Sequence, residues 1–237
     1  MRRVLFSIVC LLVSGSIYAA PIRSALGAFR GYDDESSVPY DSEVEYLEST
    51  GGDYIYVPHF RKSNLIDITV VGSFSPTSRN MNYLWELWYG NNIIGLRCYK
   101  QEEPQFLSVI SSVYTTGINP LEIHEYRMYN TNSTEAWPRM YFEVDGVQLT
   151  TLGYNNQEES ERGLSLFSLQ PWNSNYNSSG IRIYHLFGSS SNVKIDLIPV
   201  RFTNENGETE GAMYDKVSKE LFSNQGTGSF LIGPDKE

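Results

Sequence analysis

Aromatic side chains that stand beside charged and amide groups are the first residues in this sequence that could do chemistry. Sugar rings present apolar C–H faces and hydroxyl edges, so a glycan site needs a flat aromatic ring next to polar groups. The candidate ligand-binding residues are Glu86, Trp88 and Arg97 in one segment, and Trp172 and Tyr176 in an asparagine-rich run. Aromatic residues more often pack in or beside a core, and the same side chains would also suit a protein partner. We therefore expect a binding role for them, with simple packing as the alternative.

Paired carboxylates are the next arrangement to consider, because a retaining glycosidase needs two carboxyl groups about 5–5.5 Å apart. The nearest acidic pattern is EVDGVQ at 143–148, in which Gln148 stands where a further acid would be required. Its Asp-Gly pair also predicts a tight hairpin that places Glu143 opposite Gln148. The chain has no Gly-x-Ser-x-Gly elbow for a serine nucleophile either. The sequence therefore predicts no catalytic residues.

The sequence also contains few arrangements of residues that could bind a metal ion. The three histidines show no His-x-His or His-Glu-x-x-His spacing, so no transition-metal site is expected. Glu158, Glu159 and Glu161 could hold calcium together with backbone carbonyls, because Ca²⁺ asks only for hard oxygen ligands. Acidic runs are more often solvated loops. We expect no cofactor, with calcium at these three residues as the alternative.

Composition excludes some partners. The 237 residues carry a formal net charge of −10, and charged residues are 19% of the chain, below the roughly 25% usual for soluble domains. Nucleic acids and anionic lipids attract basic surfaces, and the sequence has no long Lys/Arg run that would supply one. Aromatic residues reach 14%, led by 17 Tyr, which is typical of proteins built from pleated strands. We expect neither nucleic acid nor a membrane surface as a partner.

The N-terminal segment has the layout of a secretory signal peptide. Arg2 and Arg3 precede an apolar stretch that ends before Ala19-Ala20-Pro21, and cleavage after Ala19 avoids a proline at the new N-terminus. The apolar stretch is shorter than the ~20 residues that span a bilayer, so an uncleaved anchor is the lesser alternative. The expected location is secreted, periplasmic or at the cell surface. Cys98 then remains as the single cysteine, expected to be a buried small hydrophobe, with pairing between chains as the alternative.

Beyond the signal peptide the chain divides into three parts. Residues 1–19 are the signal peptide, 20–42 a flexible tether, 43–234 one antiparallel β-sandwich and 235–237 a tail. The sandwich is predicted because short apolar runs alternate with turn residues and no helical stripe occurs. The expected strands are 43–48, 54–57, 65–74, 82–89, 93–99, 105–114, 121–129, 140–144, 147–151, 164–169, 181–187, 193–202, 211–214 and 230–232.

A second hairpin is predicted between 83 and 99. Asn tolerates positive φ, so Asn91-Asn92 can form a two-residue turn. That register places Glu86 opposite Arg97 and Trp88 over Gly95, on a face that is not fully buried. A longer turn through Gly90 would shift the register.

Both ends of the predicted sandwich carry recognisable runs. They are EYLESTGGDYI at 45–55, LIPVR at 197–201, GAMYDKV at 211–217 and NQGTGSF at 224–230. These runs resemble a large group of uncharacterised bacterial and phage concanavalin A-like domains. The resemblance implies a laminin-G-like jelly roll that is secreted, surface-associated or carried on tail fibres, and it implies no activity. The motif residues are Gly211, Tyr214, Asp215, Gly226 and Gly228, for which we expect a structural role.

Physical chemistry supports that structural role. Glycines such as Gly226 and Gly228 allow positive φ or close backbone approach, and Asp215 can accept a hydrogen bond from the amide two residues on. We therefore expect a noncatalytic binding module for a glycan or a cell-surface protein. The alternatives are a structural component of a cell-envelope assembly and, after that, a glycoside hydrolase or polysaccharide lyase on the same fold.

Overall fold

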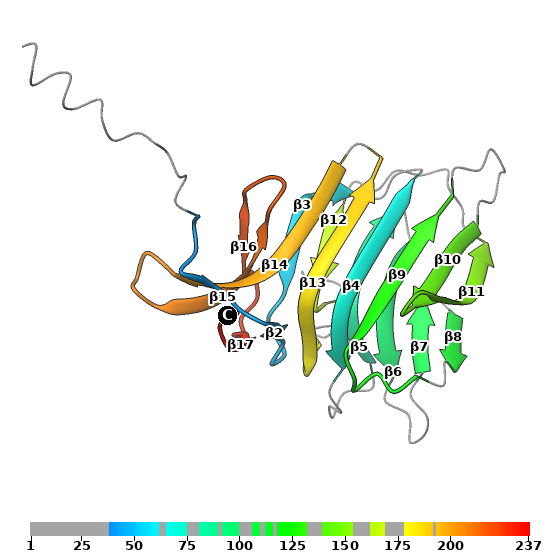
Figure 1. The fold of residues 1–237 in the computed structure, drawn as a ribbon, viewed down its shortest axis with the longest axis horizontal. Coiled ribbons are helices and arrows are strands. Elements are labelled where there is room, and N and C mark those ends of the chain that lie inside the picture. The colour runs from blue at the N-terminus through cyan, green and yellow to red at the C-terminus, as the bar shows by residue number, and fades with distance from the viewer. Residues whose placement is uncertain are drawn as a thin grey trace, which may run out of the picture. The chain divides into compact units, whose positions relative to one another are not determined.

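The computed structural model describes residues 38–61, 65–74, 81–89, 92–99, 106–109, 112–115, 118–131, 139–153, 162–168, 178–191 and 193–237. Within these ranges the chain is all β and contains no helix, so none of them holds a helix that could cross a membrane. Two antiparallel sheets lie face to face, one in front of the other in Figure 1, and the β-sandwich is confirmed. The predicted signal peptide lies outside the described residues.

The larger sheet has eleven strands, eight of which follow one path. In spatial order they are β11 (Val147–Gly153), β10 (Arg139–Val144), β9 (His124–Asn130), β4 (Ile66–Phe74), β13 (Ile181–Ser190), β14 (Val193–Thr203), β15 (Thr209–Asp215) and β16 (Leu221–Ser223). Three short strands join this path: β1 (Ser42–Glu43) pairs with β14, while β2 (Leu47–Glu48) lies between β13 and β17 (Leu231–Ile232).

The smaller sheet has six strands. Their order is β3 (Ile55–Arg61), β12 (Gly163–Leu166), β5 (Met81–Tyr89), β6 (Asn92–Tyr99), β7 (Phe106–Val109) and β8 (Ser112–Thr115). The single strand expected at 105–114 is therefore a hairpin, in which Val109 pairs with Ser112. The short strand β16 was not expected at all.

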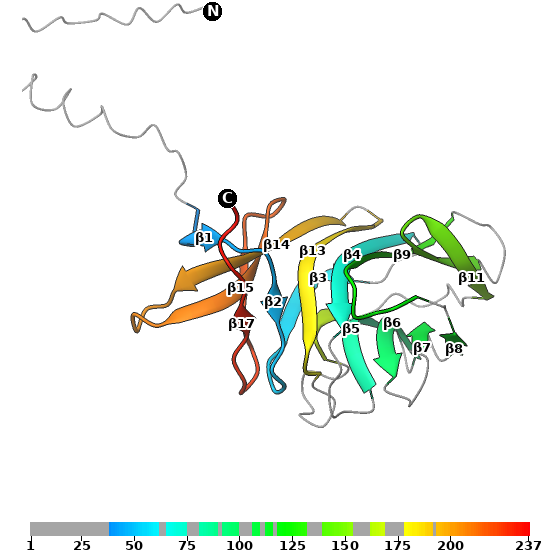
Figure 2. The same cartoon turned by 60° about the horizontal axis from the view of Figure 1, so that its bottom comes forward.

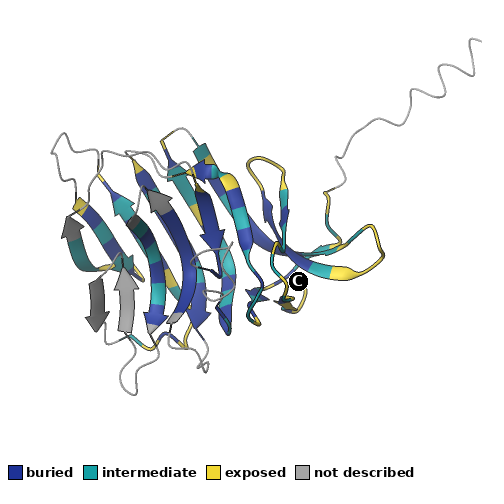
Figure 3. Cartoon of the chain, turned by 180° about the vertical axis from the view of Figure 1, so that it is seen from behind, coloured by how far each residue is buried: buried dark blue, intermediate teal, exposed yellow. Residues whose placement is uncertain are grey.

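The main core lies between the sheets, where inward side chains alternate with outward ones along each strand. On β10, for example, Met140, Phe142 and Val144 are buried, whereas Tyr141 and Glu143 are partly exposed. Figure 3 shows buried segments on both sheets. Cys98 is buried as predicted, and its burial raises the pKa of its thiol to about 11.

One of the two predicted hairpins is confirmed. Asp145 and Gly146 form the two-residue loop between β10 and β11, with positive φ values of 50° and 75°. Positive φ at both positions is the requirement of a type I′ turn, which Asp-Gly meets at low cost. Glu143 lies opposite Gln148, as expected.

The predicted register of the β5–β6 hairpin is wrong. Tyr89 pairs with Asn92, so Asn92 belongs to β6 and not to the predicted Asn91-Asn92 turn. Glu86 consequently lies across from Gly95, Trp88 lies across from Ile93, and a register shift between Tyr83 and Trp85 aligns the far end.

The first and last segments of the sandwich meet in a contact that we call the terminal clasp, formed by residues 49–54 and 224–229. Gly52 O accepts hydrogen bonds from the amides of Thr227 at 2.7 Å and Gly228 at 3.0 Å. Asn224 Oδ1 accepts bonds from the amides of Tyr54 and Gly226. The two motif ends quoted above are therefore in direct backbone contact, and Figure 2 shows β2 and β17 side by side next to them.

Asp53 holds the first half of the clasp. Its fully buried carboxylate accepts hydrogen bonds from Gly51 N at 2.7 Å, Thr50 N at 3.1 Å and Ser49 Oγ at 3.2 Å. Burial raises the pKa of Asp53, although these hydrogen bonds act in the opposite direction. Buried carboxylates are stable only when such donors surround them, so the turn and the acid depend on one another.

Asp215 plays the corresponding part at the end of β15. It is fully buried, and its carboxylate accepts hydrogen bonds from Val217 N, as predicted, and from Ser218 N, Ser218 Oγ and Asp196 N. The motif residue Tyr214 is buried beside it and packs edge-on against Tyr40 at 4.9 Å.

Contacts with the sheet extend beyond both predicted ends of the sandwich, residues 43 and 234. Asp41 N donates to Arg201 O at 2.8 Å, and Ser42 already belongs to β1, so ordered contacts begin before Glu43. At the other end, Lys236 N donates to Glu43 O at 3.0 Å and Asp235 pairs with Val44. Chain ends that find backbone partners become part of the sheet.

His124 joins a loop to the Asp145–Gly146 turn. Its Nδ1 lies 2.7 Å from Asp145 Oδ2 and its Nε2 lies 3.0 Å from Asn119 O. The other oxygen of Asp145 accepts a hydrogen bond from Glu125 N at 2.9 Å. Burial alone would raise the pKa of Asp145, but the hydrogen bonds from Glu125 and His124 outweigh it and lower that pKa.

We expect Gly226→Ala to lower the free energy of unfolding by about 2–3 kcal/mol, because a Cβ there would overlap Gly52 O and force the clasp apart. Urea denaturation followed by tryptophan fluorescence measures the change. Gly207→Ala is the control: its φ is +79° and its added Cβ meets nothing within 4 Å, so only the conformational cost of about 1 kcal/mol should appear. Equal losses in both variants would contradict the role of the clasp.

We expect Asp145 to make stability pH-dependent in the acid range. Its folded pKa is lower than its unfolded value, so its contribution is present above the unfolded pKa of about 3.9 and is lost as pH falls through the folded pKa. Asp145→Asn keeps a turn residue that tolerates positive φ and removes this contribution. The gap in unfolding free energy between wild type and variant should therefore shrink from pH 6 to pH 2.5. Glu205→Gln, in the exposed turn after β14, is the control; an unchanged gap for Asp145→Asn would refute the assignment.

Candidate functional site

Only some of the residues predicted to bind a ligand have side chains in the described part of the structure. Glu86 is fully buried on β5 between Ser165 of β12 and Gly95 of β6, so its side chain is not exposed as was predicted. Arg97 shares the face of Gly95, because alternate residues of a strand point to one side, and it is partly exposed. The structure therefore places Glu86 and Arg97 on one face but not opposite each other.

The other predicted candidates cannot be placed. The backbone of Trp88 belongs to β5, and its side chain lies outside the described part of the chain. Trp172 and Tyr176 also lie outside it, as do the calcium candidates Glu158, Glu159 and Glu161. Among the residues that are described, no group of three or more His, Cys, Asp or Glu side chains could hold a metal ion.

The structure draws attention instead to a hollow of about 420 Å³ on the outer face of the larger sheet. It lies over β4, β13 and β14 and reaches the turn after β15. The residues that matter for its chemistry are Asp67, His185, Phe187, Lys194, Asp196 and Val217. We call this the outer-face hollow.

Phe187 is exposed in this hollow because of a β-bulge. Ile181 and Ile183 of β13 face the core, and simple alternation would send Phe187 inward as well. The register between β13 and β4 shifts between Ile183 and His185, and this extra residue reverses the alternation. Leu186 is consequently buried, whereas Phe187 is 41% exposed.

Polar side chains surround the exposed ring. Asp196 of β14 lies directly opposite Phe187, and Ser189 lies opposite both Lys194 and Asp67. His185 Nε2 lies 2.6 Å from Asp196 Oδ1, and the imidazole ring lies 5.5 Å from the ring of Phe187. Val217 is 54% exposed and adds an apolar wall. The hollow thus combines an aromatic surface with hydrogen-bonding groups.

Asp67 also belongs to a network that stiffens the neighbouring strands. Arg127 of β9 donates to both of its carboxylate oxygens, at 3.0 Å and 2.8 Å, and its other Nη atom lies 3.6 Å from Glu143. The guanidinium group covers the ring of Tyr129 at 4.3 Å, and this ring stacks on Tyr141 at 5.2 Å. The hydrogen bond to Asp67 raises the pKa of Arg127, and the bond from Tyr129 to Glu143 raises the pKa of Tyr129.

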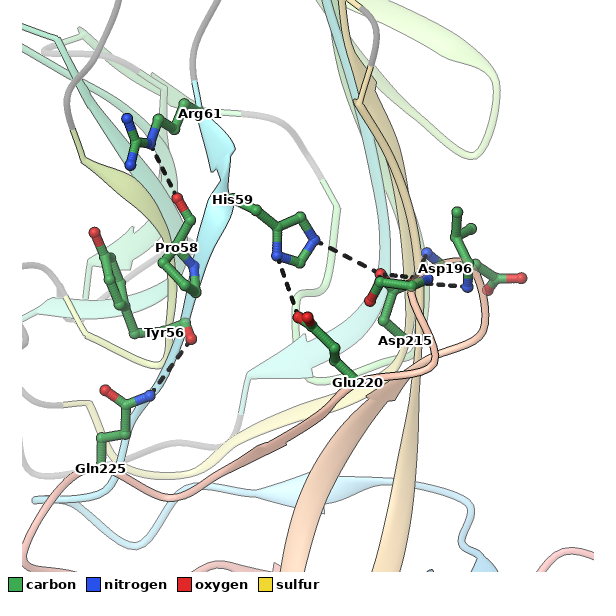
Figure 4. Close-up of polar contacts among 10 residues, drawn as sticks. Tyr56, Pro58, His59, Arg61, Asp196, Asp215, Glu220 and Gln225 are labelled. Atoms are coloured by element: carbon green, nitrogen blue, oxygen red, sulfur yellow. Dashed lines mark hydrogen bonds and ion pairs between the residues drawn. The ribbon is translucent and has the colours of Figure 1, made fainter. Parts of the chain in front are cut away.

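A second polar cluster lies where β3 approaches the turn after β15 (Figure 4). His59 Nε2 lies 3.7 Å from Asp215 Oδ2, and His59 Nδ1 lies 3.6 Å from Glu220. Asp215 is already satisfied by its turn, so this cluster is a contact between the two sheets rather than an open site. All three histidines therefore lie beside carboxylates that are at least 11 positions away from them in the sequence.

The sequence did contain a signal for the outer-face hollow. In KIDL at 194–197, Lys194 and Asp196 alternate with buried Ile195 and Leu197, so a polar outer face could be predicted for β14. The exposure of Phe187 could not, because it depends on the position of the bulge.

Comparison with known proteins adds no assignment to this geometry: no protein-family model matches the chain, and no curated protein matches it.

Proposed function

We propose that the chain is an exported, noncatalytic binding module that holds a glycan in the outer-face hollow. One observation carries the proposal: Phe187, 41% exposed, lies among Asp67, His185, Lys194 and Asp196 in a hollow of about 420 Å³. The exposed part of this ring, with polar neighbours around it, suits the C–H face of a sugar.

The size of the hollow favours a glycan over a surface protein. Pockets for small ligands have volumes of roughly 300–1,000 Å³, and this hollow lies within that range. Protein interfaces instead bury about 800 Å² on each partner and use several aromatic anchors. Within the described face, Phe187 is the exposed aromatic ring that lines the hollow.

Binding without catalysis is supported by the arrangement of the acids. Asp67 and Asp196 lie on β4 and β14, with β13 between them. Neighbouring strands are ~4.8 Å apart, so the two backbones are separated by about 10 Å. Each carboxylate is also held by its own cation or imidazole, Arg127 and His185 respectively.

We further propose that the sandwich is a concanavalin A-like jelly roll, as the resemblance of its two ends implies. The terminal clasp supports this, because the residues quoted for that resemblance are the ones that contact each other. Export follows from the predicted signal peptide and would deliver the module to the compartment in which extracellular glycans occur.

We expect Phe187→Ala to raise the Kd for the glycan at least about tenfold, because the ring supplies the apolar contact. A glycan array with the purified exported protein identifies the ligand, and calorimetric titration measures the loss. The melting temperature should change little, because a half-exposed ring contributes less than the ~3–5 kcal/mol of a buried phenylalanine.

Leu231→Ala on β17 is the matched control, because Leu231 is 56% exposed and does not line the hollow. Its affinity for the glycan should equal that of the wild type. Failure of the wild-type protein to bind any glycan on the array would refute the proposed function. Unchanged binding by Phe187→Ala would move the site elsewhere on the molecule.

A further inference from the structure

We infer that the glycan held in the outer-face hollow is neutral, and that its hydroxyl groups are recognised as donors by the two carboxylates of the hollow. This inference rests on the proposed function. It follows from counting which charged groups around Phe187 remain available to a ligand.

Asp196 offers a free acceptor. Its Oδ1 is bonded to His185 Nε2 at 2.6 Å, and its Oδ2 accepts no hydrogen bond from any residue in the ranges that the structure describes. The side chain of Asp196 is 38% exposed, so a ligand can reach it. Because β14 pairs Asp196 directly with Phe187, an acceptor stands next to the aromatic surface.

Asp67 offers acceptors on the opposite side of β13. Arg127 occupies one position on each carboxylate oxygen, and each oxygen keeps a second lone pair. Arg127 also fixes the direction of this carboxylate, so Asp67 cannot turn away from a ligand without breaking two hydrogen bonds. Hydroxyl groups above Phe187 therefore find fixed acceptors on two sides.

Positively charged side chains near the hollow are mostly engaged in ion pairs with carboxylates of the protein itself. Arg127 is engaged by Asp67 and Glu143, and His185 is engaged by Asp196. Lys194 is the remaining cation of the lining, and no ion pair involving it occurs among the described residues. A carboxylate or sulfate on the ligand would gain this one exposed lysine and would face Asp67 and Asp196.

The net negative charge of the whole chain also disfavours acidic ligands. With a formal net charge of −10, the protein repels acidic polysaccharides before they reach the hollow. A positively charged amino sugar would be attracted, but its attraction would weaken with salt, as all exposed charge pairs do. A neutral sugar has no such dependence, and this difference makes the inference testable.

The test is calorimetric titration of the full exported protein with neutral, acidic and amino-sugar probes. The neutral probes are cellohexaose, laminarihexaose, maltohexaose and mannohexaose; the acidic probes are hexagalacturonate and hexaguluronate; chitosan hexaose is the cationic probe. Each is measured at 20 mM and 500 mM NaCl. We expect a neutral hexaose to bind, with a Kd that changes less than about twofold between the two salt concentrations.

Two variants separate the acceptors from the lysine. Asp196→Asn should weaken binding of the neutral hexaose at least about tenfold, because an amide replaces the charged acceptor. Lys194→Met, which keeps the length of the side chain, should weaken it by a clearly smaller factor than Asp196→Asn, because a neutral ligand makes no ion pair with Lys194. Thermal melting of both variants within a few degrees of the wild type controls for folding, because both side chains lie at the surface.

The possible results distinguish a failure of the inference, neutral recognition, from a failure of the proposed function, glycan binding. Binding confined to the uronate hexamers, weakened by salt and lost in Lys194→Met, would overturn neutral recognition and leave glycan binding intact. Binding confined to chitosan hexaose and weakened by salt would also overturn it. Absence of binding to every probe and to a wider glycan array would refute the proposed function itself.

Discussion

The backbone contact between Gly52 and the Gly226–Gly228 turn is the constraint on which the rest of the sandwich depends. It brings residues from opposite ends of the domain close enough for Gly52 O to accept two amide hydrogen bonds. The chain then continues on each side into β2 and β17, which pair with each other, and β2 pairs with Arg182 and Ile183 of β13. The bulge that exposes Phe187 begins at Ile183. The clasp and the hollow are thus connected through one strand.

Local signals in the sequence predicted local structure well. The pairing of Glu143 with Gln148 required only the Asp145-Gly146 turn, and the turn at Asp215 required only a carboxylate two residues before a free amide. In both cases the deciding atoms are within six residues of one another. The β-sandwich itself was also predictable, because alternation of apolar and polar residues recurs along most of the described strands.

Features that depend on a second strand were not predictable. Glu86 was expected on an open face, but it is fully buried beside Ser165, a residue that is 79 positions away in the chain. Strict alternation from Ile181 and Ile183 would place Phe187 inside, and one extra residue on β13 places it outside. A bulge shifts every later residue to the other face while it leaves the local sequence pattern unchanged. The position of such a shift is set by the partner strand, which periodicity does not reveal.

The location of the hollow on strands rather than loops has a consequence for the mode of binding that we propose. Asp67, Phe187 and Asp196 are carried by three adjacent, hydrogen-bonded strands, and Arg127 and His185 fix the two carboxylates from the side. Little backbone or side-chain freedom remains to be lost when a ligand arrives, so the entropic cost of ordering the site is already met by folding. Such a surface suits a weak ligand like a sugar ring, because each of its few contacts contributes to affinity instead of offsetting rearrangement. The same rigidity means that changes in the clasp, which aligns β13 through β2, would reach the hollow as changes in strand position.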